Sequence, residues 1–386
     1  MAATVERRIP VFSPTMDVLA DMEARGLLHD TTGRTAMAAR LAAGPITLYC
    51  GFDPTADSLH IGNLIGLLAL RRFQAAGHRP IALAGGATGM IGDPSGRSDE
   101  RKLLDDATLS ANLAAIREQI GRILGSAEGW VLVDNREWTG ELRLLDFLRD
   151  VGKHVTVNQM MAKESVRTRL QGEAGISYTE FTYMLLQAHD YLWLHEHHGC
   201  ELQVGGSDQW GNITAGIDLI RRRASHAVHG LTWPLWLRSD GEKFGKSATG
   251  DNLWLGAHRT SPYQFFQYWM HVPDADARRF LLQLTLLPVP EVEAIVASHG
   301  AAPERREGQR ALAREVTTVV HGAGAAAAAE AASAVLFGSD LDGVDPAVLA
   351  MVAEEVPTTT IDPERLIAGI DVVELLVETG LVLSKT

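Results

Sequence analysis

The central part of this chain alternates short runs rich in β-branched and aromatic residues with longer runs of helical character. Parallel strands need crossover connections and helices supply them, so the alternation predicts an α/β fold with a Rossmann-like, doubly wound parallel sheet. Gly77 and Gly125 end the two clearest helical runs, residues 59–76 and 103–124. The expected strands are residues 46–52, 79–84, 130–133, 201–204 and 231–237.

The segments that follow these strands carry most of the glycine and polar residues of interest. In a doubly wound sheet, ligands bind beyond the carboxyl ends of the strands. Residues 51–63, 85–101 and 205–212 all occupy such positions. We therefore expect these three segments to build the functional site.

Downstream of Gly256 the pattern becomes almost entirely helical. Ser261 and Pro262 form a typical helix start, an N-cap followed by proline at the first helical position. The chain thus divides into a helical N-terminal segment (1–45), an α/β domain (46–256), an all-α domain (257–337), a linker (338–370) and a final helical piece (371–386).

Composition indicates a globular protein and excludes several classes. Of the 386 residues, 46% are hydrophobic and 22% charged, which provides ample core. The net charge of −13 argues against a uniformly basic nucleic-acid coat, although local clusters such as Arg221, Arg222 and Arg223 could still meet phosphates. Cys50 and Cys200 lie far apart, which predicts reduced thiols rather than a disulfide framework or a zinc site. We find no membrane span or signal-peptide pattern and expect a cytoplasmic protein.

Two short motifs far apart in the sequence are suited to the handling of phosphate. His60, Gly62 and Asn63 open a predicted helix, where free backbone N–H groups and the positive end of the helix dipole attract anions. Lys243 and Lys246 lie in the motif Lys-Phe-Gly-Lys-Ser at residues 243–247. Neither motif supplies a nucleophile, so we expect both to stabilise charge on a phosphate during its transfer.

The lysine motif resembles a P-loop without matching it. Three residues separate Gly241 from Gly245, whereas the P-loop pattern has four, and no helix is predicted to follow. We expect instead a mobile loop that closes over a triphosphate.

A predicted helix that begins at a capping box formed by Ser177 and Glu180 carries an unusual polar stripe. Tyr183, Gln187 and Asp190 occupy positions i, i+4 and i+7 on one side of it. The stripe either lines a polar pocket or forms an exposed face.

Tyr49, at the end of the first strand, could meet Asp190 at one small ligand that bears a hydroxyl group. Such a pair selects a phenol, because an analogue without the hydroxyl would leave buried polar groups unpaired. Asp93 follows the glycine-rich residues 85–92 and is expected to bind an ammonium group, with help from Tyr183 and Gln187.

Two further groups of residues leave alternatives open or are set aside. Residues 205–210 could let a flat ligand approach the backbone while Asp208 accepts hydrogen bonds from ribose, or could form an ordinary turn in which Ser207 or Asp208 caps the next helix. We expect no metal site, since the cluster His195, His197 and His198 has no carboxylate or Cys at ligand spacing.

The motifs, taken in order, closely resemble those of bacterial tyrosyl-tRNA synthetases, which are class I aminoacyl-tRNA synthetases. They are Tyr-Cys-Gly-Phe-Asp-Pro-Thr at 49–55, His-Ile-Gly-Asn at 60–63, Gly-Ser-Asp-Gln-Trp-Gly-Asn at 206–212 and Lys-Phe-Gly-Lys-Ser at 243–247. The likeness runs from about Met16 to the last residue. Selection of tyrosine over phenylalanine is a known property of that family.

The resemblance implies a domain plan and a reaction. It implies a Rossmann-like catalytic domain, an insertion at about residues 130–171 that supports a homodimer, a helical anticodon-arm domain, and only the start of an S4-like RNA-binding domain at 371–386. L-tyrosine and ATP would give tyrosyl-AMP and pyrophosphate, and tyrosine would then pass to the 3'-terminal adenosine of tRNA(Tyr). Mg²⁺ would travel with ATP, without a dedicated protein cage.

The resemblance also implies a role for each motif residue. L-tyrosine would be bound by Tyr49, Asp93, Tyr183, Gln187, Asp190 and Gln209. ATP would be bound by Cys50, Gly51, Asp53, His60, Asn63, Gly206, Asp208 and Lys246. The catalytic set that stabilises the departing pyrophosphate would be Thr55, His60, Asn63, Arg97, Arg101, Lys243 and Lys246.

The sequence departs from the pattern of the family in three respects. Asn63 replaces the second His of the class I signature, Phe244 and Gly245 replace the commoner Met-Ser, and Arg97 stands where Lys is frequent. We expect these changes to alter loop kinetics and ATP affinity without changing the reaction.

Two other functions remain as alternatives. A tryptophanyl-tRNA synthetase is disfavoured because Tyr49 and Asp190 suit a phenol better than an indole N–H. A small-molecule adenylyltransferase would share the helix start at His60 but would not need a helical domain for RNA.

Overall fold

Five parallel strands form one sheet at the centre of the computed structural model, which describes residues 17–95, 104–125, 129–172, 175–236, 252–338, 340 and 342–382. The strand order β3-β2-β1-β4-β5 reverses its direction between β1 and β4, as in a Rossmann fold. The predicted α/β fold is confirmed, and every expected strand is present near its predicted bounds. The strands are β1 (Thr47–Phe52), β2 (Arg79–Ala84), β3 (Val131–Asp134), β4 (Cys200–Gly206) and β5 (His229–Trp233).

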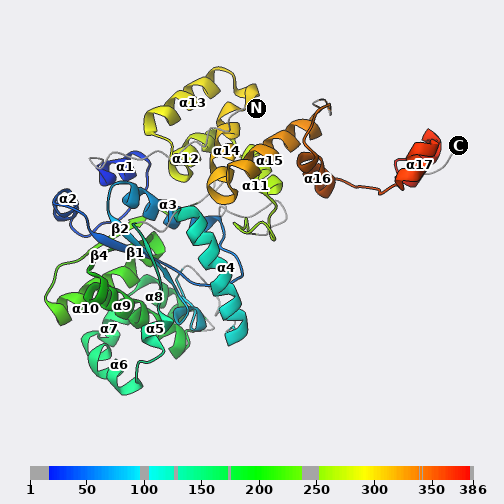
Figure 1. Cartoon of the computed structure of the whole chain (residues 1–386). Coiled ribbons are helices and arrows are strands. Elements are labelled where there is room, and N and C mark those ends of the chain that lie inside the picture. The colour runs from blue at the N-terminus through cyan, green and yellow to red at the C-terminus, as the bar shows by residue number, and fades with distance from the viewer. Residues whose placement is uncertain are drawn as a thin grey trace.

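Helices cover both faces of the sheet (Figure 1). Helices α3 (Ile61–Ala75) and α4 (Asp106–Leu124) pack on one face, and α9 (Tyr178–His198) and α10 (Trp210–Ala224) pack on the other. Since successive side chains of a strand point to opposite faces, β1 serves both cores. Leu48, Cys50 and Phe52 join the core with α3, whereas Tyr49 joins the core with α9.

Shorter helices surround this framework. The α/β part also contains α1 (Val18–Ala24), α2 (Arg34–Ala42), α5 (Arg136–Thr139), α6 (Leu144–Asp150), α7 (Val157–Met161) and α8 (Glu164–Gln171). Helices α5 to α8 fall within the predicted insertion, but β3 at its beginning belongs to the central sheet.

The start of α9 differs from the expected capping box. The Ser177 hydroxyl accepts a hydrogen bond from the Glu180 backbone N–H, as predicted. The Glu180 carboxylate, however, pairs with Arg169 at 2.9 Å, and both side chains are buried. A buried charge requires a partner of opposite sign, and the neighbouring helix α8 supplies one.

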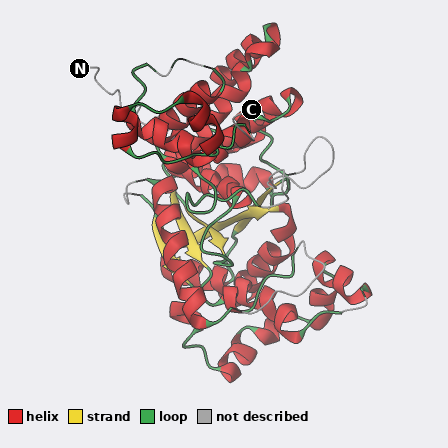
Figure 2. Cartoon of the chain, turned by 90° about the vertical axis from the view of Figure 1, so that its right-hand side faces the viewer, coloured by secondary structure: helices red, strands yellow, loops and turns green. Residues whose placement is uncertain are grey.

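A layer of helices lies above the sheet in Figure 1 and Figure 2. Ser261 caps α11 with Pro262 at its first position, as expected. The range 338–370, expected to be a linker, contains α16, whose Glu355 accepts hydrogen bonds from Ser261 and Gln264. The layer consists of α11 (Pro262–Met270), α12 (Asp274–Leu284), α13 (Val289–Ala301), α14 (Glu307–His321), α15 (Ala323–Leu336) and α16 (Pro346–Glu355).

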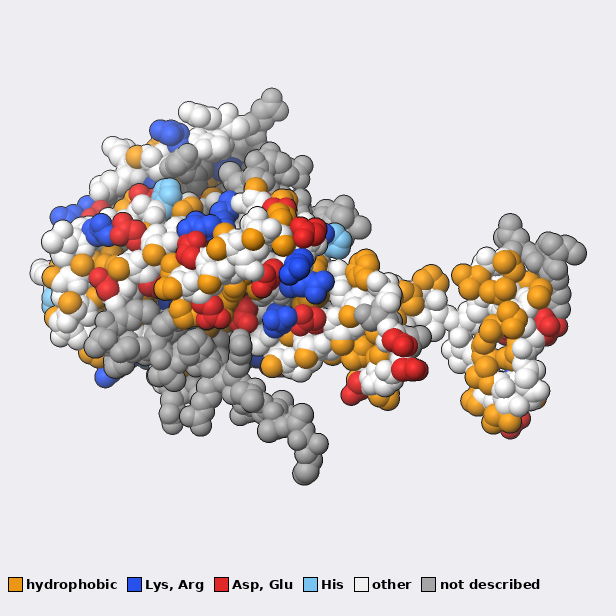
Figure 3. Space-filling view, turned by 90° about the horizontal axis from the view of Figure 1, so that it is seen from above, with side chains coloured by type: hydrophobic (Ala, Val, Ile, Leu, Met, Phe, Trp, Pro, Cys, Tyr) orange, Lys and Arg blue, Asp and Glu red, His pale blue; other side chains and the backbone are white. Residues whose placement is uncertain are grey.

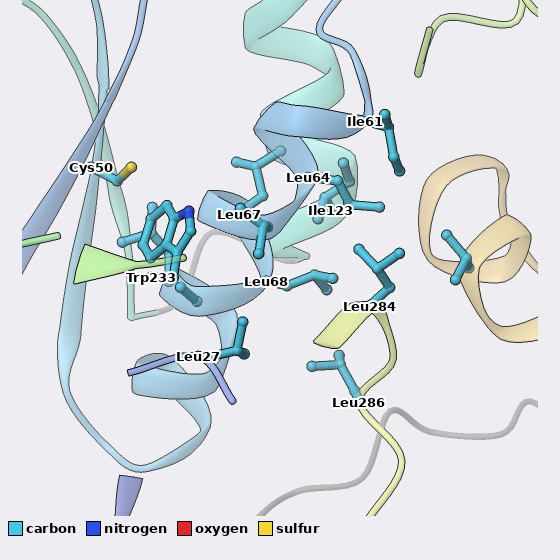
Figure 4. Packing of buried hydrophobic residues seen from close by; sticks show 14 of the residues in the cluster. Leu27, Cys50, Ile61, Leu64, Leu67, Leu68, Ile123, Trp233, Leu284 and Leu286 are labelled. Atoms are coloured by element: carbon cyan, nitrogen blue, oxygen red, sulfur yellow. The ribbon is translucent and has the colours of Figure 1, made fainter. Parts of the chain in front are cut away.

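Helix α3 joins the sheet to this helical layer. Leu64, Leu67 and Leu68 pack in one buried cluster with Ile123 of α4 and Leu284 of α12 (Figure 4). The helix that begins at the phosphate-type motif is therefore held in place by the core of both layers.

Helices α17 (Pro363–Ala368) and α18 (Val372–Glu378) lie apart from the main body (Figure 3). Their apolar side chains are largely exposed, with 88% of Ile367 accessible to solvent. The assignment of this region to an S4-like domain stays a prediction.

Candidate active site

A cavity of about 350 Å³ opens at the carboxyl ends of β1 and β4, where the strand order reverses. This is the position at which open α/β sheets bind ligands. The structure brings together in its lining all the described members of the predicted tyrosine-binding, ATP-binding and catalytic sets. They are Tyr49, Cys50, Gly51, Asp53, Thr55, His60, Asn63, Asp93, Tyr183, Gln187, Asp190, Gly206, Asp208 and Gln209.

Four residues of the expected catalytic set lie outside the described residues. They are Arg97, Arg101, Lys243 and Lys246.

His60 and Asn63 cap the helix that faces the cavity. The His60 Nδ1 atom accepts a hydrogen bond from the Gly62 N–H at 3.1 Å, and Asn63 Oδ1 accepts from the His60 N–H at 3.0 Å. Both side chains thus fix the start of α3 while they line the cavity. The positive end of the helix dipole points the same way, so the arrangement favours an anion.

The polar stripe of α9 lines the cavity, as one of the two alternatives predicted. Tyr183, Gln187 and Asp190 all belong to the lining, and Asp190 is only 2% exposed. The alternative of an exposed face is therefore excluded.

Two residues that sequence reasoning missed hold the Asp190 carboxylate. Asn135 Nδ2 donates to Asp190 Oδ2 at 2.9 Å, and Trp138 Nε1 donates to Asp190 Oδ1 at 2.8 Å. The pKa of Asp190 is raised to about 7, mainly by burial. The nearby Asp53 and Asp134 also raise this pKa, whereas the two hydrogen bonds lower it. The only available signal was that Asn135 directly follows β3, at the same edge of the sheet as the other site residues.

A chain of hydrogen bonds links the two halves of the cavity. Asn135 Nδ2 also donates to Thr88 Oγ1 at 3.0 Å, and Thr88 donates to Asp53 Oδ1 at 2.8 Å. The Tyr183 hydroxyl donates to Asp53 Oδ2 at 2.9 Å. Asp190 and Asp53, expected at the tyrosine and the ATP respectively, are therefore positioned by one network.

Tyr49 places a phenol group in the same cavity. Its side chain is 1% exposed, and its hydroxyl has no hydrogen-bond partner among the residues that the structure describes. Burial and the nearby Asp190 raise the pKa of Tyr49, so the hydroxyl is a neutral donor. A buried polar group of this kind indicates a place for a polar ligand atom.

Asp93 and Gln209 form a second polar group in the cavity. Gln209 Nε2 donates to Asp93 Oδ2 at 2.7 Å, although 116 residues separate them in the sequence. The other oxygen, Asp93 Oδ1, accepts from the Ser95 backbone N–H.

The turn after β4 does not use its polar side chains as helix caps. Neither the short 3₁₀ segment at Ser207–Gln209 nor α10 has a side-chain cap bond, and Asp208 lines the cavity. The Asp208 carboxylate lies close to the backbone of Gly206. A Cβ at position 206 would lie only 2.5 Å from Asp208 Oδ1, so glycine makes room for the carboxylate. The capping interpretation is therefore wrong, whereas the approach of a flat ligand and the role of Asp208 at a ribose stay predictions.

Glycine is also required where β2 meets the hydrogen-bond network. A Cβ on Gly85 would lie 2.0 Å from Asp53 Oδ1, and one on Gly86 would lie 2.2 Å from Asp134 Oδ1. The glycine-rich run therefore lets the backbone approach these carboxylates closely.

The described His, Cys, Asp and Glu side chains were also compared with the requirements of a metal site. Within the described ranges, no group of three or more His, Cys, Asp and Glu side chains is arranged to hold a metal ion. His195 instead contacts the Cys200 carbonyl and His226, each at 2.8 Å. No helix in the described part of the chain is long and apolar enough to cross a bilayer.

Comparison with known proteins gives consistent matches. The family described as tRNA synthetases class I (W and Y) matches residues 41–338. The tyrosine-tRNA ligase of Opitutus terrae is 54% identical over 374 residues, 96% of this chain and 88% of that protein. The tyrosine-tRNA ligase of Roseiflexus castenholzii is 49% identical over 373 residues, 96% of this chain and 87% of that protein.

Solved structures agree with this assignment. A C-terminally truncated mitochondrial tyrosyl-tRNA synthetase of Aspergillus nidulans superposes with a TM-score of 0.76 at 30% identity, over 83% of this chain and 94% of that one. A tryptophanyl-tRNA synthetase of Encephalitozoon cuniculi shares the fold alone, with a TM-score of 0.60 at 13% identity over 86% and 90% of the two chains. With the cavity at the switch point of its sheet and these matches over nearly its whole length, the chain belongs to the class I tRNA synthetases of the tryptophan and tyrosine group, within the tyrosine-tRNA ligases.

Proposed function

We propose that the chain activates L-tyrosine with ATP in this cavity and transfers it to tRNA(Tyr) in cytoplasmic protein synthesis. One observation carries the choice of amino acid: the unpaired Tyr49 hydroxyl and the Asp190 carboxylate line the same buried cavity. A phenol can donate to Asp190 and accept from Tyr49, which satisfies both groups at once. Phenylalanine would leave the Tyr49 hydroxyl unpaired and would give Asp190 no donor beyond Asn135 and Trp138, and an indole N–H could only donate.

The second polar group suits the α-amino acid end of the substrate. Asp93, with Tyr183 and Gln187, would accept hydrogen bonds from the ammonium group, and Gln209 would donate to the carboxylate. The 2.7 Å hydrogen bond from Gln209 to Asp93 supports both roles. It places a donor for the carboxylate, Gln209, beside an acceptor for the ammonium group, Asp93.

ATP would occupy the part of the cavity between β1, α3 and β4. Gly51, Gly206 and Asp53 would contact adenosine, with Asp208, Cys50 and Asn63 near the ribose. His60 is the N-cap of α3 and Thr55 lines the same cavity, so both would meet the phosphates. Four basic residues predicted from the sequence alone would also stabilise the phosphates, namely Lys243, Lys246, Arg97 and Arg101. Mg²⁺ would accompany the triphosphate as part of the substrate.

In the first step a carboxylate oxygen of tyrosine attacks the α-phosphorus of ATP, and the bond to the pyrophosphate oxygen breaks. In the second step a terminal ribose hydroxyl of the tRNA attacks the tyrosyl carbonyl, loses its proton, and releases AMP. The protein contributes positioning and charge stabilisation to both steps, because the substrates supply the attacking and leaving groups.

A homodimer is proposed through the insertion. Leu144 and Leu145 of α6 are 71% and 77% exposed, and Val157, Met161 and Tyr178 lie exposed nearby in the sequence. Exposed apolar side chains concentrated in one region are typical of an interface. Helices α11 to α15 of the helical layer would meet the anticodon arm, as the family resemblance implies.

Tyrosine-dependent exchange between ATP and pyrophosphate tests the proposed function. The wild-type chain should catalyse exchange with tyrosine, Asp190→Ala should lose selection for tyrosine, and Lys246→Ala should slow activation. Exchange driven by tryptophan, or by a small molecule that is not an amino acid, would favour one of the alternative functions. Lack of any tyrosyl-AMP would refute the proposal.

A further inference from the structure

Trp138, the indole donor to Asp190, lies at the inner end of a stack of three rings. Trp193 stacks face to face on Trp138, with ring centroids 4.0 Å apart and planes 10° apart. The ring of His197 covers the other face of Trp193 at 4.2 Å and 12°. The stack runs from His197, which is exposed, to the buried indole that contacts the carboxylate.

The two sides of the stack come from helices of very different length. Asp190, Trp193 and His197 are all on α9, at spacings of three and four residues that place them on one side of a long helix. Trp138 belongs to α5, which has only four residues. So short a helix is barely stable by itself, and packing of its side chains has to fix its orientation.

The ring of Trp193 is one of the groups that pack on Trp138. A hollow of about 390 Å³ adjoins both tryptophans and is lined by Glu137, Glu141, Leu142 and His189. Trp138 is 7% exposed and belongs to the buried cluster on the α9 side of the sheet, and beside the hollow the face of Trp193 covers its ring.

We propose that Trp193 is a positioning residue for tyrosine selection, because its ring holds the Trp138 N–H in line with Asp190 Oδ1. This inference rests on the proposed function and deepens it. A hydrogen bond to a carboxylate weakens steeply as its angle departs from linearity, so a rotated indole would release one oxygen of Asp190. The carboxylate would then lose the fixed position in which it meets the substrate hydroxyl.

The test compares Trp193→Leu, which removes the flat ring, with Trp193→Phe, which keeps one. We expect Trp193→Leu to lower kcat/KM for tyrosine about tenfold in exchange with pyrophosphate, mainly through the KM of tyrosine. Activation of phenylalanine should change much less, since that substrate has no hydroxyl for Asp190 to hold. The KM of ATP should stay unchanged, and Trp193→Phe should restore most of the tyrosine activity.

Trp130→Leu provides the matched control, because it removes a partly buried tryptophan at the opposite end of β3. It should leave the ratio of tyrosine to phenylalanine activation unchanged. If Trp193→Leu does not fold, Trp193→Met makes the same comparison with Trp193→Phe.

The outcomes separate this inference from the proposed function. A wild-type chain without tyrosine-dependent exchange would refute the function itself. An active wild type together with an unchanged tyrosine-to-phenylalanine ratio in Trp193→Leu would overturn the inference alone. An equal loss for both amino acids would overturn it as well, since that pattern indicates general structural damage.

Discussion

Asn135 and Asp190 are separated by 55 residues in the sequence, yet their side chains form a 2.9 Å hydrogen bond inside the protein. Both ends of the Asn135 amide form hydrogen bonds. Its Oδ1 atom accepts from the Ala87 N–H at 2.7 Å, and its Nδ2 atom also donates to Thr88. These contacts fix which end of the amide faces the carboxylate. Asn135 therefore couples the position of Asp190 to the glycine-rich turn after β2.

Replacement of Asn135 should damage the tyrosine site without unfolding the protein. Asn135→Ala removes a donor to the Asp190 carboxylate, so kcat/KM for tyrosine should fall by about tenfold or more. Asn158→Ala on the exposed face of α7 is the control and should behave like wild type. Unchanged tyrosine kinetics in Asn135→Ala would mean that Trp138 alone positions the carboxylate.

Tyrosine activation should depend on pH through Asp190. Its pKa of about 7 means that the carboxyl is neutral below pH 7 and ionised above it. The ionised form is the better acceptor for a phenol, so kcat/KM for tyrosine should rise as pH increases through about 7. Asp190→Asn should abolish this inflection. A wild-type profile of kcat/KM that is flat from pH 6 to pH 8, about one pH unit on either side of the pKa, would contradict a role for ionised Asp190.

The same group should affect stability in the opposite direction. In the unfolded chain the pKa of an aspartate is about 3.9, whereas burial raises the folded value to about 7. Between these values the folded state binds a proton that the unfolded state does not, so stability falls as pH rises through this window. Urea unfolding should be measured at pH 5 and pH 8, about two pH units below and about one above the folded pKa. The free energy of unfolding should decrease more between these two pH values for wild type than for Asp190→Asn.

The buried Arg72 should contribute strongly to stability. Its Nη2 atom donates to the carbonyls of Gln283 and Thr285 at 2.9 and 2.8 Å, which ties α3 to the end of α12. Burial lowers its pKa to about 9, so it remains charged at neutral pH. Arg72→Met should reduce the free energy of unfolding by about 3 kcal/mol, because buried carbonyls lose their donor.

Arg278 is a suitable control for that measurement. It forms an exposed ion pair with Glu293, and such pairs contribute less than about 1 kcal/mol. Urea unfolding of Arg278→Met should therefore resemble wild type. If both variants lost the same free energy of unfolding, the contacts of Arg72 to α12 would contribute no more than an exposed ion pair.

The exposed leucines of α6 should be needed for the proposed homodimer. The double variant Leu144→Glu and Leu145→Glu places two charges on this surface, so the dimer should dissociate in sedimentation velocity experiments. Phe337→Glu is the control, because Phe337 is 77% exposed but lies in the helical layer. A double variant that still sediments as a dimer would place the interface elsewhere.

Several features could be predicted from local sequence because local physics controls them. The alternation of strands and helices, the cap at Ser261 and the stripe of Tyr183, Gln187 and Asp190 all follow from periodicity or from spacing along one helix. The capping box at Glu180 was wrong in part, because Arg169 from another helix offers a stronger partner. The helix α16 was missed because the surface on which it packs lies far away in the sequence.

By itself the sequence determined which residues follow which strand, and therefore which polar groups would gather at one edge of the sheet. Only the tertiary structure decided that Asn135, Thr88 and Trp138 would hold the carboxylates, since each is a single residue without a periodic neighbour. The physical reason is that a buried charge takes its partners from whatever lies beside it in space. That proximity is set by strand order and helix packing, which join segments that the chain keeps far apart.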